Sequence, residues 1–262
     1  METLTKSLIR LIKNKKNHQK NDFELEIHFF FDDSFDKTAS GKVTNKWVNQ
    51  YLEVLERVLP ENSQENIGNQ GELAETPYGG RIRLLVFGVE WTIHLKDSEK
   101  IKKGLRWTQV MYMNYVCHWK IKQEKDARIR EENSFILAID GDVDFRPVDF
   151  DLVLSRMLDS SEIAACCSQI EPTGSGPMVW FQHFEYGIQH YSKLFSEKFL
   201  GSVLCTSHCF CILRMSALKP VLKDYAKEAS DGRTKIMFDP EFEVWQKITA
   251  PAIGPLHVSG LP

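Results

Sequence analysis

The sequence lacks the features that define several large classes of protein. Its six cysteines include no Cys-x-x-Cys pair, so the spacing indicates neither a zinc ribbon nor a secreted disulfide framework. No run approaches the roughly 18 apolar residues that a membrane-spanning helix needs. The longest run is Leu84–Val89. The Walker loop, the G-x-G-x-x-G turn and the G-x-S-x-G elbow are also missing. A reducing, cytosol-facing environment is the simplest interpretation.

The sequence also lacks a strong charge of either sign. It has 33 basic and 36 acidic residues, and the net charge of −3 is too balanced to attract the protein as a whole to nucleic acid or to a membrane surface. We expect no nucleic-acid partner, and any argument from charge must be local. With 262 residues, 42% of them hydrophobic and 26% charged, the chain has the composition of a globular protein with a sizeable core. That length allows one large domain or two small ones.

Strand-like and helix-like segments alternate along the chain. Apolar runs indicate strands, and the longer amphipathic or aromatic stretches between them indicate helices. The expected strands are 23–32, 81–87, 91–95, 134–139, 162–167 and 209–213, and the expected helices are 44–59, 106–123, 149–158, 179–195 and 216–227. This alternation predicts an α/β protein with an open, mostly parallel sheet and helices on both faces. In such sheets ligands bind beyond the carboxyl ends of the strands.

The first 22 residues differ in character from the rest of the chain. Residues 1–20 carry six lysines and arginines, together with a helical comb of Leu4, Leu8, Leu11 and Ile12. The apolar run is too interrupted for a secretory signal. We expect residues 1–22 to be a solvated basic lead-in, 23–235 to be the folded domain, and 236–262 to be a divergent C-terminal tail.

Three carboxylates follow the expected strand 134–139. They are Asp140, Asp142 and Asp144, with Gly141 and Val143 between them. Alternate residues of an extended chain point the same way, so two of these side chains can share one hard cation such as Mg²⁺ or Mn²⁺. An Asp- and Gly-rich turn is the alternative, because both residues are common in turns. The position at a strand's carboxyl end favours a metal–diphosphate site.

A second cluster is cationic and begins at Lys96. It continues with Lys100, Lys102, Lys103 and Arg106. Ammonium and guanidinium groups near a metal would neutralise a diphosphate leaving group. The alternative is an ordinary solvated charged face, and composition does not separate the two.

A third cluster is aromatic and follows a tight Gly/Pro turn at 174–177. It contains Trp180, Phe184 and Tyr186 on a predicted helix, with Gln182 and Glu185 among them. Aromatic faces suit the C–H-rich faces of sugar rings, but for Trp180 and Tyr186 core packing is the more common role.

Taken together and in order, these motifs resemble those of animal-type chitin synthases. The matching words are PYGGR at 77–81, HLKD at 94–97, RWTQVMYM at 106–113, LAIDGDVDFRP at 137–147, GSGPMVWFQHFEY at 174–186 and VLC at 203–205. The resemblance covers about residues 25–230, and the GSGPMVW motif is highly specific.

The resemblance implies a processive, inverting family 2 glycosyltransferase with a GT-A-like nucleotide-diphosphosugar transferase domain. Such enzymes use UDP-N-acetylglucosamine to extend a β-1,4-linked chitin oligomer, which is the acceptor. The resemblance matches Asp142 and Asp144 to the metal- and diphosphate-binding carboxylates, with Asp140 beside them, and Lys96 to a donor-binding lysine. It places Gln182, Phe184, Glu185 and Tyr186, with Trp180 nearby, on a helix that lines the donor and acceptor region.

The same resemblance implies membrane attachment through transmembrane segments that this chain lacks. The full-length parent is expected in the plasma membrane, with its catalytic domain facing the cytosol. The chain itself is expected to be a fragment, since the family's later Gln-Arg-Arg-Arg-Trp motif is absent before Pro262.

The sequence departs from the family at the general base. The family places an Asp in a Gly-Glu-Asp-Arg-Trp motif, whereas here Glu243 alone falls near that position. Loss of a positioned base costs about 10²–10⁴ in rate, so we expect weak or no transfer by this chain alone. A catalytically inactive donor-binding relative is the main alternative, and a soluble metal-dependent nucleotidyltransferase or phosphohydrolase is a weaker one.

Overall fold

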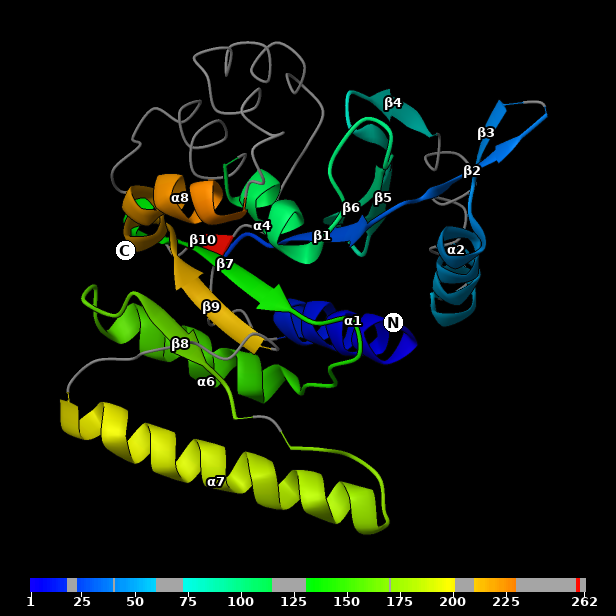
Figure 1. Cartoon of the computed structure of the whole chain (residues 1–262). Helices are drawn as coiled ribbons and strands as arrows, with labels where there is room; N and C mark the ends of the chain where they lie inside the picture. Colours follow the sequence, from blue (N-terminus) through cyan, green and yellow to red (C-terminus); the bar gives the residue numbers. More distant parts are fainter. Residues whose placement is uncertain are drawn as a thin grey trace.

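The computed structural model of the chain describes most of its length. The residues it describes are 1–17, 23–39, 41–59, 73–114, 131–169, 171–200, 210–229 and 258–259. Within them, helices and strands alternate along the chain, and the strands form two four-stranded sheets and a two-stranded ribbon (Figure 1).

The first sheet has the strand order β1-β6-β5-β4. β1 (Glu26–Phe31) lies parallel to β6 (Val89–Lys96), which pairs antiparallel with β5 (Gly79–Val86), and β5 pairs with the short β4 (Ala74–Thr76). Phe87 and Gly88 join β5 to β6, with φ values of 52° and 83°. Two residues of positive φ between paired strands are typical of a type I′ hairpin, which confirms the tight turn predicted at Gly88.

The second sheet has the strand order β10-β7-β9-β8. β7 (Ser134–Ile139) is flanked by β9 (Phe210–Arg214) and β10 (Val258–Ser259), and β8 (Ala165–Cys167) lies on the other side of β9. The ribbon consists of β2 (Phe35–Thr38) and β3 (Gly41–Thr44).

The α/β class is confirmed, but the pairing within the sheets is mixed. Among the described strands β1 and β6 form the parallel pair, and all other pairs are antiparallel. The expectation of one open and mostly parallel sheet is therefore wrong for the described residues. Periodicity indicates where a strand lies and whether both of its faces are buried, but it does not reveal the direction of its neighbour.

Helices cover both faces of the second sheet. Phe135 and Leu137 of β7 pack in one cluster with α6 (Pro147–Asp159), whereas Ile136 between them packs with α4 (Leu105–Asn114) and α8 (Met215–Ala229). Alternate residues of a strand face opposite sides, so the two clusters lie on opposite faces of the sheet. Figure 1 shows α4 and α8 above this sheet and α6 below it.

The N-terminal helix α1 (Glu2–Asn17) belongs to the core. Leu4, Leu8, Leu11 and Ile12 are buried, and α1 packs against α2 (Lys46–Val58) and α6. The prediction of a solvated lead-in is therefore wrong for residues 2–17. The apolar comb on one helical face outweighs the basic residues, of which Lys6, Arg10 and Lys13 are exposed.

The remaining predicted elements appear close to their expected positions. Strands 134–139 and 209–213 correspond to β7 and β9, and helix 179–195 lies within α7 (Pro177–Leu200). The expected helix 106–123 is confirmed over 106–114, and its remainder lies outside the described residues. No helix in the described part of the chain combines the length and the apolar character needed to cross a bilayer.

Candidate functional site

A cavity of about 370 Å³ opens where β1 and β7 end. Its walls come from α1, β1, α4 and β7, and most of them are apolar. Polar groups gather at the ends of the strands and on α4, namely Asp32, Thr108, Gln109 and Asp140. The carboxyl ends of strands are where α/β proteins place their ligands, so this cavity is the candidate site.

The buried Lys96 lies behind two residues of the cavity wall, Asp32 and Thr108. Lys96 is 1% exposed, and its Nζ donates to Asp32 and, at 2.7 Å, to Oγ1 of Thr108. The parallel register that pairs Phe31 with Leu95 brings Asp32 level with Lys96. The other oxygen of Asp32 accepts a hydrogen bond from the backbone N–H of Gly104 at 2.9 Å. A buried ammonium needs such a partner, because an unpaired charge in this position is strongly unfavourable.

The PYGGR and HLKD motifs meet across one strand pair. Gly79 lies opposite Lys96 in the β5–β6 register, and the N–H of Asp97 donates to the carbonyl of Tyr78 at 2.7 Å. A Cβ at Gly79 would come within 2.2 Å of the Leu95 carbonyl oxygen, and its φ of 143° also favours glycine. The close approach of β5 to the end of β6 therefore requires glycine here.

Aromatic and histidine side chains stack beside the ion pair. His28 Nδ1 lies 2.9 Å from His94 Nε2, and the hydroxyl of Tyr78 lies 2.8 Å from His94 Nδ1. Phe30 stacks on His94 with ring centroids 4.3 Å apart. Burial, together with the nearby charges of Arg81 and Arg83, lowers the pKa of His94 to about 3, so the imidazole is neutral at neutral pH. His28 and Phe30 also line the cavity, which gives it an aromatic wall.

The acidic loop, defined as residues 140–144, follows β7. Its backbone turns at Asp140, whose carbonyl accepts from the N–H of Val143 at 3.2 Å. Asp140 lines the cavity and Asp142 is exposed. Asp144 instead accepts a hydrogen bond from Ser7 at 2.7 Å and forms an ion pair with Arg10. The Ser7 hydrogen bond and the Arg10 guanidinium hold the pKa of Asp144 below its usual range.

The acidic loop supplies part of the ligand set that a hard cation needs. No three His, Cys, Asp or Glu side chains come together as a metal cluster in the described segments. Two carboxylates suffice for Mg²⁺ or Mn²⁺ when substrate phosphates and water supply the other ligands, and Asp140 and Asp142 carry oxygens of the right chemistry. Oδ1 of Asp144 is engaged by Ser7 and Arg10 of α1. The sharing of one cation by Asp142 and Asp144, expected from the sequence, stays a prediction.

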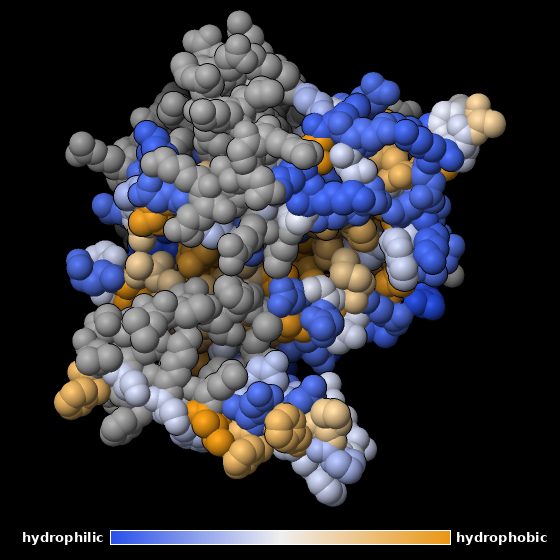
Figure 2. Space-filling view, viewed as in Figure 1, coloured by the Kyte–Doolittle hydropathy of each residue, from blue (hydrophilic) through white to orange (hydrophobic). Residues whose placement is uncertain are grey.

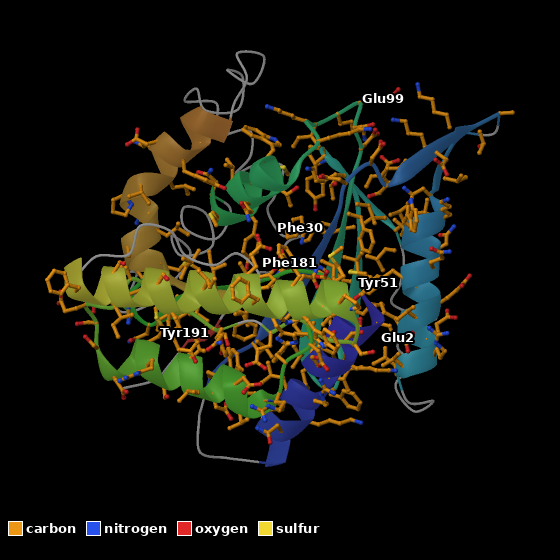
Figure 3. The ribbon with its side chains drawn as sticks, turned by 60° about the horizontal axis from the view of Figure 1, so that its bottom comes forward. Glu2, Phe30, Tyr51, Glu99, Phe181 and Tyr191 are labelled. Atoms are coloured by element: carbon orange, nitrogen blue, oxygen red, sulfur yellow. The ribbon has the colours of Figure 1, made fainter. Side chains whose placement is uncertain are left out.

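The aromatic helix α7 stands apart from the cavity. Trp180 is 69% exposed, and Gln182, Phe184, Glu185 and Tyr186 are exposed as well. The core packing expected for Trp180 and Tyr186 is therefore wrong. Figure 2 shows hydrophobic side chains along the lower edge of the molecule, over α7, and Figure 3 shows Phe181 and Tyr191 projecting from that helix. The described structure does not bring these side chains to the acidic loop.

Two predicted site residues have no described side chain. Arg106 lies in the first turn of α4, next to the cavity residue Thr108, but only its backbone is described. Glu243, the expected position of the general base, lies outside the described residues.

Sequence reasoning missed three groups at the site, namely Asp32, His28, and the pair Ser7 and Arg10. Asp32 follows a strand in the same way as Asp140 does, so its position was a usable signal. Ser7 and Arg10 lie more than 130 positions from their partner Asp144, and no local pattern connects them.

Comparisons with known proteins all point to one family. The family model for chitin synthase matches residues 94–227. Two chitin synthases of Caenorhabditis elegans, chs-2 and chs-1, are each 34% identical over 264 aligned residues, which cover 94% of this chain. A chitin synthase of Meloidogyne artiellia is 32% identical over 263 residues, again covering 94% of the chain.

The aligned region is a small part of these relatives. It spans 16% of chs-2, 20% of chs-1 and 14% of the Meloidogyne protein. No solved structure matches the chain.

Proposed function

Since the chain belongs to the chitin synthase family, we propose that it forms part of a glycosyltransferase domain that transfers N-acetylglucosamine from UDP-N-acetylglucosamine to a growing β-1,4-linked chitin chain. The observation that carries the proposal is the cavity at the ends of β1 and β7, which has a buried lysine–aspartate pair on one side and an acidic loop on the other. Ligand pockets combine mostly apolar and aromatic walls with a few polar or charged groups, and a nucleoside diphosphate offers a flat base to the first and a charged diphosphate to the second.

On this proposal the two sides of the cavity do different work. The pair of Lys96 and Asp32, held by Thr108 and the Gly104 amide, forms a rigid polar wall, and the partly exposed Asp32 carboxylate accepts hydrogen bonds from the nucleoside. His28 and Phe30 supply flat faces beside it. Arg106, in the first turn of α4, is a further cation proposed to act on the diphosphate.

The acidic loop is the proposed metal side. Asp142, with Asp140 beside it, holds Mg²⁺ or Mn²⁺, and Asp144 belongs to the same loop. The bound cation would neutralise charge on the diphosphate as it leaves. Because Asp142 is exposed, its carboxylate is free of the desolvation cost that a buried ligand pays before binding.

The acceptor side of the proposal rests on α7 and the C-terminal segment. Trp180, Phe184 and Tyr186 offer exposed aromatic faces on which sugar rings stack, and Gln182 and Glu185 offer hydrogen bonds. Glu243 is the proposed proton acceptor for the acceptor hydroxyl. We further propose that the full-length protein is held in a membrane and that its product is a chitin oligomer extended at this site.

Calorimetry with UDP-N-acetylglucosamine and Mn²⁺ tests the metal side. We expect Asp142→Ala to abolish measurable binding, whereas Asp159→Ala, an exposed carboxylate at the far end of α6, leaves binding unchanged. Equal affinities for the wild-type chain and Asp142→Ala would contradict the metal assignment. Binding that persists without Mn²⁺ in both would also contradict it.

A further inference from the structure

The contact between α1 and the acidic loop joins two parts of the chain that local sequence does not connect. Ser7 is fully buried, and its hydroxyl donates to Asp144 Oδ1 at 2.7 Å. The same hydroxyl accepts from the N–H of Phe145 at 3.3 Å and from Arg10 Nη2 at 2.8 Å. Arg10 Nη2 also donates to the carbonyl of Phe145 at 3.1 Å and pairs with Asp144. Ser7 and Arg10 therefore hold both the Asp144 side chain and the Phe145 backbone at the end of the acidic loop.

Helix α1 is firmly anchored beneath this contact. Leu4, Leu8, Leu11 and Ile12 are buried in the main core, so the helix does not move freely relative to β7. The start of α1 also lies against the loop, because the sulfur of Met1 is 2.6 Å from where a Cβ on Gly141 would stand. Figure 1 shows the tip of the β7 arrow beside α1.

The electrostatics of the loop explain why such a contact is needed. Asp140, Asp142 and Asp144 lie within five residues and carry the same charge, so their carboxylates repel one another. Arg10 neutralises Asp144, and the neighbouring Arg146 is paired with Asp149 instead. One end of the acidic loop is fixed by β7 and the other by α1. Asp140 therefore lines the cavity, and Asp142 is exposed to solvent.

We propose that Ser7 and Arg10 are positioning residues for the acidic loop, acting through Asp144, so that Asp140 and Asp142 present their carboxylates to a divalent cation and a nucleoside diphosphate. This inference rests on the proposed function, since it concerns the same loop. In this arrangement Asp144 orients the loop, and Asp142 binds.

Calorimetry with UDP and Mn²⁺ as the probe measures the effect. We expect Arg10→Gln and Asp144→Asn each to weaken binding about 10-fold, the size typical of groups that orient a metal ligand. Arg10→Lys restores part of the loss because it keeps the charge. Lys6→Gln is the matched control, since it removes a cation from the same helix that pairs with Glu2 and not with the loop. Unchanged or tighter binding in Arg10→Gln would overturn the proposal.

A double-mutant cycle tests whether Arg10 acts through Asp144. If it does, the double variant Arg10→Gln/Asp144→Asn binds about as weakly as either single variant. Independent roles would give losses that multiply to about 100-fold, and this outcome would contradict the proposal. A loss in Asp144→Asn as complete as that in Asp142→Ala would contradict it too, because Asp144 would then bind the cation directly.

Hydrogen exchange of the amides of 141–145 gives a readout that does not depend on ligand. We expect faster exchange in Ser7→Ala and Arg10→Gln than in the wild-type chain and Lys6→Gln, with circular dichroism unchanged. Equal protection in all four would overturn the positioning role even if the chain binds UDP and Mn²⁺. Conversely, faster exchange together with binding that Asp142→Ala does not affect would retain the positioning role and reject the proposed metal site.

Discussion

Lys96, which pairs with the cavity residues Asp32 and Thr108, is 1% exposed, whereas Trp180 on α7 is 69% exposed, although both lie in motifs shared with the same family. Lys96 is positioned by strand register, a carboxylate and a hydroxyl, all within the described fold. The described side chains of α7 instead face outward (Figure 3). In the cavity, the side chains proposed to serve a ligand also support the fold, so we expect function and stability to be coupled there. On α7 we expect function and stability to be independent of each other.

At neutral pH, the largest effect of a single substitution is expected where α1 meets the cavity. Leu8 is buried and lines the cavity, so Leu8→Ala removes core packing and should lower the free energy of unfolding by about 3 kcal/mol. Urea denaturation followed by circular dichroism measures this, with Lys6→Ala on the outer face as the control. A loss as small as that of the control would mean that α1 does not belong to the core.

The buried ion pair should give the next largest effect. Lys96→Met keeps most of the unbranched apolar stem but leaves Asp32 without its cation. We expect a loss of about 2 kcal/mol, below the usual cost because Asp32 is 36% exposed and remains partly hydrated. Binding of UDP and Mn²⁺ should weaken in the same variant. The exposed Lys100→Met is the matched control for both measurements. A Lys96→Met variant that keeps its stability but loses binding would separate function from fold at this site.

Acidification should weaken the cavity wall through His94. Burial lowers its pKa to about 3 in the folded chain, compared with about 6.5 when unfolded, so on acidification the unfolded chain takes up the proton first. The stabilising contribution is complete above about pH 6.5 and is lost as the pH falls toward 3, by at most about 1.4 kcal/mol per pH unit. Unfolding measured across this range should show a shallower dependence in His94→Gln than in the exposed α7 variant His183→Gln. Identical slopes in the two variants would show that His94 is not buried in neutral form.

The smallest effect on stability is expected on α7. Trp180→Ala and Phe184→Ala remove exposed side chains and should change the free energy of unfolding by less than about 0.5 kcal/mol. If α7 holds the acceptor, the same variants weaken binding of a chito-oligosaccharide, measured by calorimetry. A stability loss of several kcal/mol would instead place these aromatics in a packed core and remove the contrast with the cavity.

Local sequence patterns were sufficient to predict most of the secondary structure. The wholly apolar run 134–139 forms β7, and the segment around Gly88 forms a tight hairpin, since each depends on residues close in the chain. The family was also accessible from the motifs alone, because the comparison confirms the chitin synthase resemblance over residues 94–227. The direction of strand pairing was not accessible, because burial on both faces is equally compatible with antiparallel neighbours.

The helices, the strands and the protein family could be predicted from the sequence because apolar periodicity and motifs depend on residues that are close in the chain. The pairing of the charged groups depends instead on the tertiary fold. Lys96 meets Asp32 because β1 and β6 run parallel, and Asp144 meets Arg10 because the apolar face of α1 is drawn into the core. A lysine-rich N-terminal segment looks solvated when only its charges are considered. Burial of four apolar side chains outweighs that tendency, and it carries Ser7 and Arg10 to the acidic loop.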